Sequence, residues 1–503
     1  MDIGRMLTWT ADRYPGRIAV GGPRPLTYRQ WDARTSQLAR ALTTLGVRPG
    51  DTVAFLLAGG EPMASLHLAT QKLGAVAVPL SIRFGPSELA YCVKDAEPRL
   101  VIADDTTRAR LSDALNNGPR FIDRAELDHW ADREPDGELA ARNENDLSVI
   151  LYTSGTTGRP KGVPRTHRAE HAATAAHVIQ TQHRPGEVTL GVMPLFHTMG
   201  VRSLLASILV GGTWVPQASF DADASLELIK HEQVSALYLV PTIYWSLLRT
   251  GRLAQAAESV ARVAYAGAPM TPALAEQING TLHPEVFVNH LGSTEIYTFT
   301  TSADVTKKPG CAGRAGVFSR VRLVDPVNPA APVPNGTQGQ VAVSMASPEA
   351  FTGYRNRPDA DARAIRDGWY LTGDLATQDD DGDLWVSGRV DDMINSGGEN
   401  LYPDEIEAAL ARCPAVSAVV VVGLPDDRWG QAVTAFVVPA RDFDAERTLR
   451  LLSAYAGSGS GLPSLKRPKR YVAVEQIPTS AVGKILRREL IEGRYQPLAE
   501  VRQ

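Results

Sequence analysis

The stretch Tyr152-Thr-Ser-Gly-Thr-Thr-Gly-Arg-Pro-Lys-Gly162 is the most distinctive segment of this 503-residue chain. Its loop at 153–158 follows the apolar, strand-like run 148–152 and offers four hydroxyls and two glycines, and the ammonium of Lys161 comes shortly after it. Backbone amides and hydroxyls of such a loop can turn onto a polyphosphate. The loop is not a Walker A motif, because Lys161 is followed by Gly162 and not by Ser or Thr. Taken alone, it is explained equally well as a polar surface turn.

Apolar β-branched runs alternate with helical patterns on both sides of this loop. One unit runs from a strand at 52–57, through a helix at 62–73, to a strand at 75–80. A second runs from a strand at 188–193, through an apolar helix after Gly200, to a strand at 213–216. Alternation of this kind is typical of parallel strands joined by crossover helices. It predicts an α/β core.

The pattern changes after Gly339, where hairpin strands at 340–344 and 383–387 are expected. The acidic cluster Asp379-Asp-Asp-Gly-Asp383 lacks the spaced ligands and distal Glu of a calcium loop, so a solvated turn is the better interpretation. Beyond the cluster a smaller unit is predicted. The expected division is an N-terminal domain at 1–388, a hinge at 389–392 and a C-terminal domain at 393–503, within which 457–461 is expected to be a flexible loop.

Composition limits the function classes. Apolar residues make up 44% and charged residues 21%, as in an ordinary globular protein. A net charge of −4 provides no general attraction for nucleic acid or an anionic membrane. Three widely separated cysteines argue against a disulfide framework or zinc knuckle. No signal peptide or spanning segment is recognised, so a cytoplasmic location without nucleic-acid or membrane partners is expected.

Six further short motifs accompany the loop in a fixed order. They are Tyr265-Ala-Gly-Ala-Pro269, Leu291-Gly-Ser-Thr-Glu295, Tyr370-Leu-Thr-Gly-Asp374, Gly388-Arg-Val-Asp-Asp392, Ser396-Gly-Gly-Glu-Asn400, and Lys484 in Pro478-Thr-Ser-Ala-Val-Gly-Lys484. With these seven elements the chain resembles, over essentially its whole length, the ANL superfamily of acyl-CoA synthetases, nonribosomal adenylation domains and luciferases. The segments 388–400, 427–431 and 465–471 are similar to those of bacterial benzoate-type, including para-halobenzoate, acyl-CoA ligases.

The resemblance implies an α/β fold with a large multi-sheet N-terminal domain and a small mobile α+β C-terminal domain. The large domain would contain two α/β subdomains and a small β-barrel-like part. The small domain would rotate between two half-reactions, with Asp391 at the hinge.

The resemblance also implies residues for ATP and Mg²⁺. ATP or AMP would be bound by Thr153, Ser154, Gly155, Thr156, Thr157, Gly158, Lys161, Gly267, Ala268, Pro269, Leu291, Gly292, Ser293, Thr294, Asp374 and Arg389. Glu295 and Thr157 would bind Mg²⁺ through oxygen. The ionised Asp374 suits the ribose hydroxyls. Lys484 would be the catalytic lysine that bridges the attacking carboxylate and the nucleotide.

For the second half-reaction the resemblance implies coenzyme A as co-substrate. Gly397 and Gly398 would let a pantetheine arm pass close to the backbone. Trp429 would stack on adenine, and Arg467 and Lys469 would pair with phosphates. A solvated basic face is the alternative for the lysines and arginines at 466–470.

The acid pocket implied by the resemblance is lined by His197, Tyr238, Ala266, His290, Gly292, Tyr297 and Thr298, with His197 also a catalytic candidate. This lining is more polar than expected for a halobenzoate enzyme, so a small polar, aromatic acid is predicted. Leu291 stands where the family usually has an aromatic residue that stacks on adenine, which implies weaker packing there.

The leading hypothesis is therefore an ATP-dependent, AMP-forming acid–CoA ligase. Two alternatives keep the adenylation step: loading of a carrier protein, and activation of nitrite for transfer to an aryl amine. A third alternative, a noncatalytic nucleotide-binding protein, would be expected to lack Glu295, Asp374, Arg389 or Lys484, and all four are present. Whether the protein is a homodimer is left open by the sequence.

Overall fold

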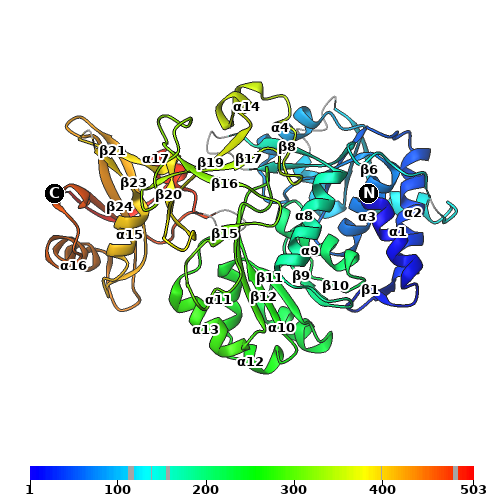
Figure 1. The fold of residues 1–503 in the computed structure, drawn as a ribbon, viewed down its shortest axis with the longest axis horizontal. Coiled ribbons are helices and arrows are strands. Elements are labelled where there is room, and N and C mark those ends of the chain that lie inside the picture. The colour runs from blue at the N-terminus through cyan, green and yellow to red at the C-terminus, as the bar shows by residue number, and fades with distance from the viewer. Residues whose placement is uncertain (112–117, 138, 154–158, 398, 480–484, 503) are drawn as a thin grey trace. The chain divides into compact units, whose positions relative to one another are not determined.

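The computed structural model describes residues 1–111, 118–137, 139–153, 159–397, 399–479 and 485–502. The chain forms two compact units (Figure 1). Unit 1 contains Met1–Val321 and Val343–Tyr370, and unit 2 contains Arg322–Ala342 and Leu371–Gln503.

Unit 1 contains two large sheets whose central strands are parallel. The first has the order β15-β14-β13-β12-β11-β9-β10-β1-β2 and the second β6-β5-β3-β4-β7-β8. Strands of the first sheet are β1 (Ile18–Val20), β2 (Leu26–Thr27), β9 (Val188–Gly191), β10 (Thr213–Pro216), β11 (Ala236–Leu239), β12 (Arg262–Tyr265), β13 (Val286–Leu291), β14 (Thr300–Ser302) and β15 (Arg314–Ala315). Those of the second are β3 (Thr52–Leu56), β4 (Val76–Pro79), β5 (Leu100–Ala103), β6 (Arg120–Asp123), β7 (Leu147–Thr153) and β8 (Lys161–Thr166).

Helices cover these sheets because the crossovers between parallel strands require them. They are α1 (Ile3–Arg13), α2 (Tyr28–Thr44), α3 (Glu61–Leu73), α4 (Pro86–Ala96), α5 (Asp105–Arg108), α7 (Arg124–Ala131), α8 (His167–Gln180), α9 (Thr198–Leu209), α10 (Ala222–His231), α11 (Pro241–Arg249), α12 (Leu253–Ala256), α13 (Pro272–Leu282) and α14 (Pro358–Ala364), with a short 3₁₀ turn at Ala109–Leu111. One apolar core includes Phe55 of β3, Leu204 of α9 and Trp214 of β10, so the two sheets share a common interior.

Unit 2 is built around a sheet of order β22-β21-β24-β25-β26, with β23 paired to β24. Its elements are β21 (Ile394–Ser396), β22 (Glu399–Leu401), α15 (Pro403–Leu410), β23 (Val416–Asp426), β24 (Gly430–Pro439), α16 (Ala445–Ser458), β25 (Arg470–Val474), α17 (Arg487–Ile491) and β26 (Pro497–Arg502). A further five-stranded sheet, through whose strands the chain passes from one unit to the other, contains β16 (Val321–Val324), β17 (Gly339–Ser344), β18 (Ile365–Arg366), β19 (Trp369–Gln378) and β20 (Leu384–Arg389).

The predicted fold class is confirmed: a large α/β part with several sheets is followed by a smaller α+β part. Both crossover units predicted from the alternating pattern are present, as β3-α3-β4 and β9-α9-β10, and both strand pairs are parallel. The prediction of a flexible loop at 457–461 was partly wrong. Helix α16 continues to Ser458, because Leu452 and Ala456 hold its last turns in the core of unit 2.

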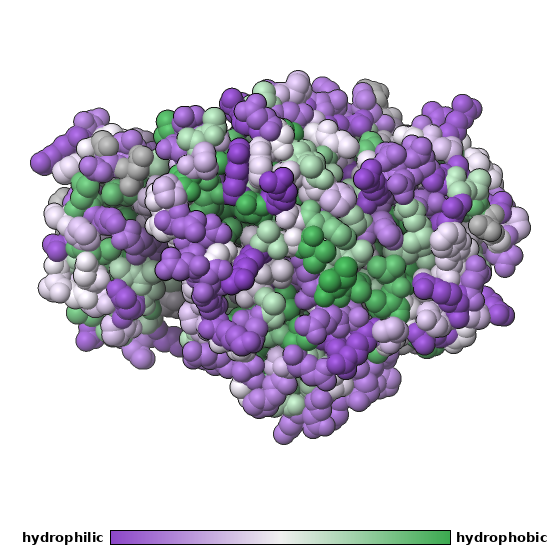
Figure 2. All heavy atoms as spheres, in the orientation of Figure 1, coloured by the Kyte–Doolittle hydropathy of each residue, from purple (hydrophilic) through white to green (hydrophobic). Residues whose placement is uncertain are grey.

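Among the described helices, none is long and apolar enough to cross a membrane. Cys92, Cys311 and Cys413 are all buried, and Cys92 and Cys413 belong to apolar cores. The face of the molecule shown in Figure 2 carries mainly polar and charged residues, with apolar areas between them.

Candidate active site

Three neighbouring parallel strands of unit 1 bring predicted site residues to one edge of the sheet. Tyr238 lies near the end of β11, Ala266 to Pro269 follow β12, and His290 and Leu291 end β13. Strand β12 pairs with both β11 and β13 in parallel. Ligands of open α/β sheets usually bind beyond the carboxyl ends of the strands. The candidate adenine-binding and acid-binding residues therefore share this edge.

Gly292, directly after β13, allows a close backbone approach. A β-carbon at this position would lie 2.0 Å from the carbonyl oxygen of Tyr297, which no side chain tolerates. The segment closes further where the amide of Ser293 donates to the carbonyl of Ile296 at 3.0 Å. A glycine is thus required for the 292–297 segment to fold back beside β13.

The predicted phosphate loop leaves and re-enters the second sheet at one place. Thr153 ends β7 and Lys161 begins β8, and the two are direct partners in the antiparallel ladder. The ladder therefore holds the two ends of the loop side by side. The loop residues Ser154, Gly155, Thr156, Thr157 and Gly158 lie outside the described residues.

Lys161 and Glu295 meet at Tyr354. The ammonium of Lys161 lies 4.2 Å from the centroid of the Tyr354 ring, and the Tyr354 hydroxyl donates to Oε1 of Glu295 at 2.6 Å. Glu295 is 5% exposed. The candidate phosphate cation and the candidate metal ligand thus share one aromatic neighbour.

Arg165 binds the Thr294–Glu295 backbone through hydrogen bonds to its carbonyls. Its guanidinium pairs with Glu170, and both side chains are completely buried. The same group donates to the carbonyls of Thr294, Glu295 and Glu349 at 3.2, 3.3 and 2.9 Å. One buried cation therefore fixes the backbone on which Glu295 stands.

The Tyr297 ring lies 3.6 Å from the Arg165 guanidinium, and its hydroxyl donates to Glu170 at 3.2 Å. The side chain of this predicted pocket residue thus faces the Arg165–Glu170 pair. Its backbone carbonyl, by contrast, accepts a hydrogen bond from Arg202 at 3.1 Å.

Three other predicted acid-pocket residues, Tyr238, Thr298 and His290, lie near Arg202, on α9. Its guanidinium donates to the Tyr238 hydroxyl at 3.4 Å and to the Thr298 hydroxyl at 2.5 Å. The His177 ring lies 4.6 Å from the Tyr238 ring and 5.4 Å from the His290 ring. Burial, reinforced by the positive charge of Arg202, lowers the pKa of both histidines well below the usual value, so both are neutral at pH 7.

His197 precedes α9 as its N-cap residue and lies next to Phe196, with ring centroids 4.9 Å apart. Burial, with a smaller contribution from the charge of Arg83, lowers the pKa of His197 to about 4. A neutral imidazole can donate one hydrogen bond and accept another. As the N-cap of α9, His197 precedes the helix that contains Arg202.

In unit 2, Asp374 of β19 and Arg389 of β20 are direct partners in an antiparallel hairpin. Nη1 of Arg389 lies 2.7 Å from Oδ1 of Asp374, and Nη2 donates to the carbonyl of Thr372 at 3.2 Å. The Asp374 side chain remains 14% exposed. The pair therefore presents an oriented carboxylate that can accept hydrogen bonds from a diol.

Two predicted coenzyme A residues, Gly397 and Lys469, and the unpredicted Arg428 lie beside Trp429 in unit 2. Gly397 has a φ of +62°, and a β-carbon there would lie 3.1 Å from the indole. Lys469 and Arg428 lie 5.5 and 4.9 Å from the indole centroid. Desolvation, and then the charges of Arg467 and Arg428, lower the pKa of Lys469.

Of the remaining predicted residues in unit 2, Asp391 lies in the short turn Val390–Asp392 and is exposed. Gly398 and Lys484 lie outside the described residues.

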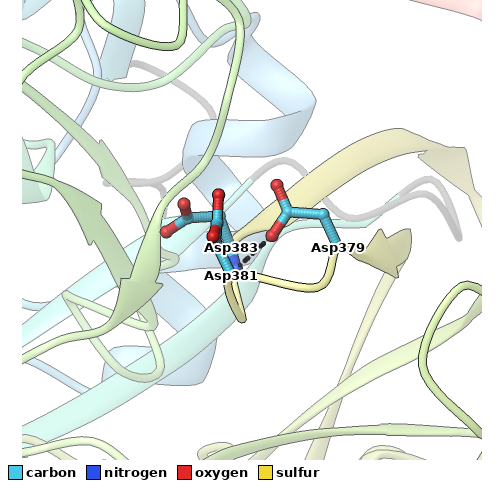
Figure 3. A group of neighbouring side chains, drawn as sticks. All are labelled: Asp379, Asp381 and Asp383. Carbon is cyan, nitrogen blue, oxygen red and sulfur yellow. Dashed lines mark hydrogen bonds between the residues drawn. The ribbon is translucent and has the colours of Figure 1, made fainter.

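The acidic cluster occupies the turn between β19 and β20 (Figure 3). Carboxylate oxygens of Asp379, Asp381 and Asp383 lie within 4.8 Å of one another. Asp379 accepts from the amide of Asp383 at 2.9 Å and from the Trp385 indole at 3.0 Å. These bonds tie the Asp379 carboxylate to the hairpin turn.

Comparison with known proteins decides the family. A model of the AMP-binding enzyme family matches residues 7–355, and its C-terminal-domain counterpart matches residues 405–484. The chain belongs to the AMP-binding enzymes. It is 33% identical to 4-chlorobenzoate–CoA ligase from Arthrobacter over 97% of this chain and 94% of that protein. It is 35% identical to feruloyl-CoA synthase from Amycolatopsis over 93% and 94%.

A solved anthranilate CoA ligase in complex with anthranoyl-AMP has the same fold, with a TM-score of 0.88 and 26% identity over 98% of this chain and 97% of that one. The resemblance to the ANL superfamily predicted from the ordered motifs is therefore confirmed for this AMP-binding enzyme.

Sequence reasoning missed five residues of this AMP-binding enzyme's site: Arg165, Glu170, His177, Arg202 and Tyr354. All five are polar or charged residues with partners more than 50 positions away, such as Glu295 for Tyr354 and Thr298 for Arg202. Only Arg202 could have been noticed in the sequence, because it is a single charged residue within the apolar helix that follows Gly200.

The described part of the site fits a hard cation at Glu295. Mg²⁺ prefers oxygen ligands in octahedral geometry and keeps several waters. Glu295 contributes a nearly buried carboxylate whose Oε1 is oriented by Tyr354. This orientation is the kind of support that metal-binding carboxylates receive from neighbouring hydrogen-bond donors.

Proposed function

We propose that this AMP-binding enzyme is an AMP-forming acid–CoA ligase that acts on a small, polar, aromatic carboxylic acid. ATP and coenzyme A are its co-substrates and Mg²⁺ its metal ion. The observation that carries the proposal is the convergence of Lys161 and Glu295 on Tyr354. Glu295 follows shortly after β13, and the rings of Tyr238 on β11 and His290 on β13 lie 5.7 Å apart. The full-length relatives named for 4-chlorobenzoate and ferulate support an aromatic acid.

In the first half-reaction a carboxylate oxygen attacks the α-phosphorus of ATP. The oxygen–phosphorus bond forms, the bond to the β-phosphate oxygen breaks, and pyrophosphate leaves. The attack places negative charge on negative charge, so the site must neutralise oxygens and align the reactants. Lys161 and the loop 153–158 would bind the outer phosphates, Glu295 would hold Mg²⁺, and Lys484 would bridge the carboxylate and the nucleotide.

In the second half-reaction the coenzyme A sulfur attacks the acyl carbon. The thioester bond forms and AMP leaves with the bonding electrons. Asp374 and Arg389 would hold the ribose hydroxyls, and Asp391 would be the hinge of the rotating small domain. Gly397 and Gly398 would admit the pantetheine arm while Trp429, Arg467 and Lys469 bind the nucleotide end. Trp429 beside Gly397, with Arg428 and Lys469 against its ring, supports free coenzyme A over a carrier protein.

Pyrophosphate release over a panel of acids tests this proposal. The panel contains benzoates, cinnamates, aliphatic acids and nitrite, each with and without coenzyme A, with the products identified by mass. We expect acyl-CoA formation from substituted benzoates. Turnover of nitrite with an aryl amine, and no turnover of carboxylates with coenzyme A, would instead establish the nitrite-activating alternative.

A further inference from the structure

Arg202 is a buried cation without an ionic partner. Arg202 is 2% exposed, and no carboxylate oxygen of the described residues lies within 4.0 Å of its guanidinium. Its described hydrogen bonds are to the hydroxyls of Tyr238 and Thr298 and to the carbonyl of Tyr297. The other fully buried arginine of this region, Arg165, is paired with Glu170. Buried charges are normally paired, so the contrast marks Arg202 as incomplete without a ligand.

Among the described residues, no group around Arg202 forms a direct ion pair with it. His177 and His290 are neutral or positive by chemistry, and both ring nitrogens of each are buried without a hydrogen-bond partner in the described chain. Glu349 is completely buried, and burial raises the pKa of its carboxyl against the opposing charges of Arg202 and Arg165. No carboxylate oxygen of Glu349 lies within 4.0 Å of the Arg202 guanidinium, so Glu349 forms no direct ion pair with it.

The hydrogen-bonding groups around Arg202 that have no partner among the described residues include several donors, beside the two carboxylate oxygens of Glu349. Nε of Arg202 is buried and has no partner among the described residues. The hydroxyls of Tyr238 and Thr298 each accept from Arg202, so each can direct its own proton to a ligand. Neutral His177 and His290 can each donate one further hydrogen bond. A donor-rich, positively charged cluster matches an oxygen acceptor.

The position of Arg202 fits the far end of a substituted aromatic ring. It lies five residues after His197, at the start of the same helix α9. At a helical rise of 1.5 Å per residue the two residues are separated by roughly 7.5 Å along the helix axis, and their side chains leave the helix about 140° apart. Arg202 is therefore set apart from His197, the catalytic candidate of the pocket.

We propose that Arg202, with the hydroxyls of Tyr238 and Thr298, recognises a hydrogen-bond-accepting oxygen on the acid substrate, at the end of the ring opposite the carboxylate that is activated. The substrate class is thus a small aromatic acid that carries a nitro, hydroxyl or second carboxyl oxygen. This inference rests on the proposed function and names its substrate class. Arg202 is a specificity residue in this scheme, since it contacts the substrate away from the reacting atoms.

Matched acids of similar size test the inference. The intact enzyme is assayed for pyrophosphate release with 4-nitrobenzoate, 4-hydroxybenzoate and terephthalate, and with 4-methylbenzoate, which has no acceptor oxygen. A hydrogen bond to a charged group at a buried site discriminates by about 10- to 100-fold in kcat/KM. We expect at least one acceptor-bearing acid to exceed 4-methylbenzoate by this factor, and Arg202→Met to bring the ratio close to one.

Two further variants separate recognition from a structural role. Arg202→Lys keeps the charge and is expected to restore part of the preference. Tyr238→Phe keeps the ring against His177 but removes the hydroxyl, so it is expected to reduce the preference by a smaller factor, and it tests the inference should Arg202→Met not fold. Arg249→Met, which removes an exposed arginine of α11, is the control for loss of a positive charge. Melting temperatures are compared for all variants.

The outcomes are distinct. Turnover of every acid with no preference in the wild-type enzyme, or an equal loss on all acids in Arg202→Met with an unchanged ratio, would overturn the inference while leaving the proposed function intact. Lack of pyrophosphate release with every carboxylic acid, including those without a para substituent, would overturn the proposed function and the inference with it.

Discussion

The hydroxyl of Tyr354 donates a 2.6 Å hydrogen bond to Oε1 of Glu295, while the ring of the same tyrosine lies under the Lys161 ammonium. Tyr354 therefore orients the proposed magnesium ligand and positions the proposed phosphate-binding cation at once. Because the two interactions use different parts of the side chain, they can be separated by mutation.

Tyr354→Phe removes the hydroxyl and keeps the ring. We expect the Mg²⁺ concentration for half-maximal pyrophosphate release to rise about 10-fold, because a metal-binding carboxylate that loses its supporting donor is less well oriented. Tyr244→Phe is a matched control, since it removes a buried hydroxyl that donates to the carbonyls of Leu237 and Ala264. An equal shift in both variants would argue against a specific role for Tyr354.

Arg165→Met breaks a completely buried ion pair and leaves Glu170 without its partner. Such a change costs on the order of 3–5 kcal/mol of unfolding free energy. The double variant Arg165→Met/Glu170→Leu removes the stranded charge and should regain part of the loss. Urea unfolding of the wild type, both single variants and the double variant measures the coupling. If the double variant loses as much unfolding free energy as the two single variants together, the two residues are not coupled and the prediction is contradicted.

Asp374→Asn tests the ribose assignment. The Arg389 guanidinium holds the Asp374 carboxylate at 2.7 Å, so the carboxylate is oriented to accept from ribose hydroxyls. We expect the wild type to prefer ATP over 3′-deoxy-ATP and the variant to lose most of this preference, with KM for ATP raised about 10-fold. Unchanged discrimination in the variant would place the ribose elsewhere.

Lys484→Ala is expected to abolish acid-dependent ATP–pyrophosphate exchange while largely sparing thioester formation from supplied acyl-adenylate. A lysine that neutralises the attacking carboxylate and nucleotide oxygens is needed for the first half-reaction only. Intact exchange in the variant would refute the assignment.

The buried His67 is expected to make the unfolding free energy of unit 1 fall at acidic pH. Burial, and secondarily the nearby His167, lowers the pKa of His67 from 6.5 to about 4. The unfolded chain therefore binds more protons between these values, and the contribution of His67 to stability is complete above pH 6.5 and is lost as pH falls towards 4. The full effect is roughly 3 kcal/mol.

His67→Gln removes this titration, so the unfolding free energy should fall less steeply between pH 6.5 and 4 than in the wild type. The slopes are compared by urea unfolding at several pH values, because the substitution also shifts the absolute stability. Parallel slopes in the two proteins would contradict the prediction.

The order of strands, helices and motifs could be predicted from the sequence because it depends on local periodicity and on short backbone requirements. The crossover units around α3 and α9 follow from apolar alternation, and Gly292 is needed because a β-carbon would collide with a nearby carbonyl. The seven ordered motifs identified the family for the same reason, since each is a contiguous segment with its own chemistry.

The chemistry of the pocket was decided only by the tertiary structure. Arg202 and Thr298 are 96 residues apart, Arg165 and the carbonyl of Glu295 are 130 apart, and Tyr354 and Glu295 are 59 apart. No local pattern indicates such partners, because the energy of a buried charge depends on which groups the folded chain brings to it. The sequence by itself determined an AMP-binding α/β enzyme. Folding decided that Arg202 is buried against Tyr238 and Thr298, with no ion pair among the described residues.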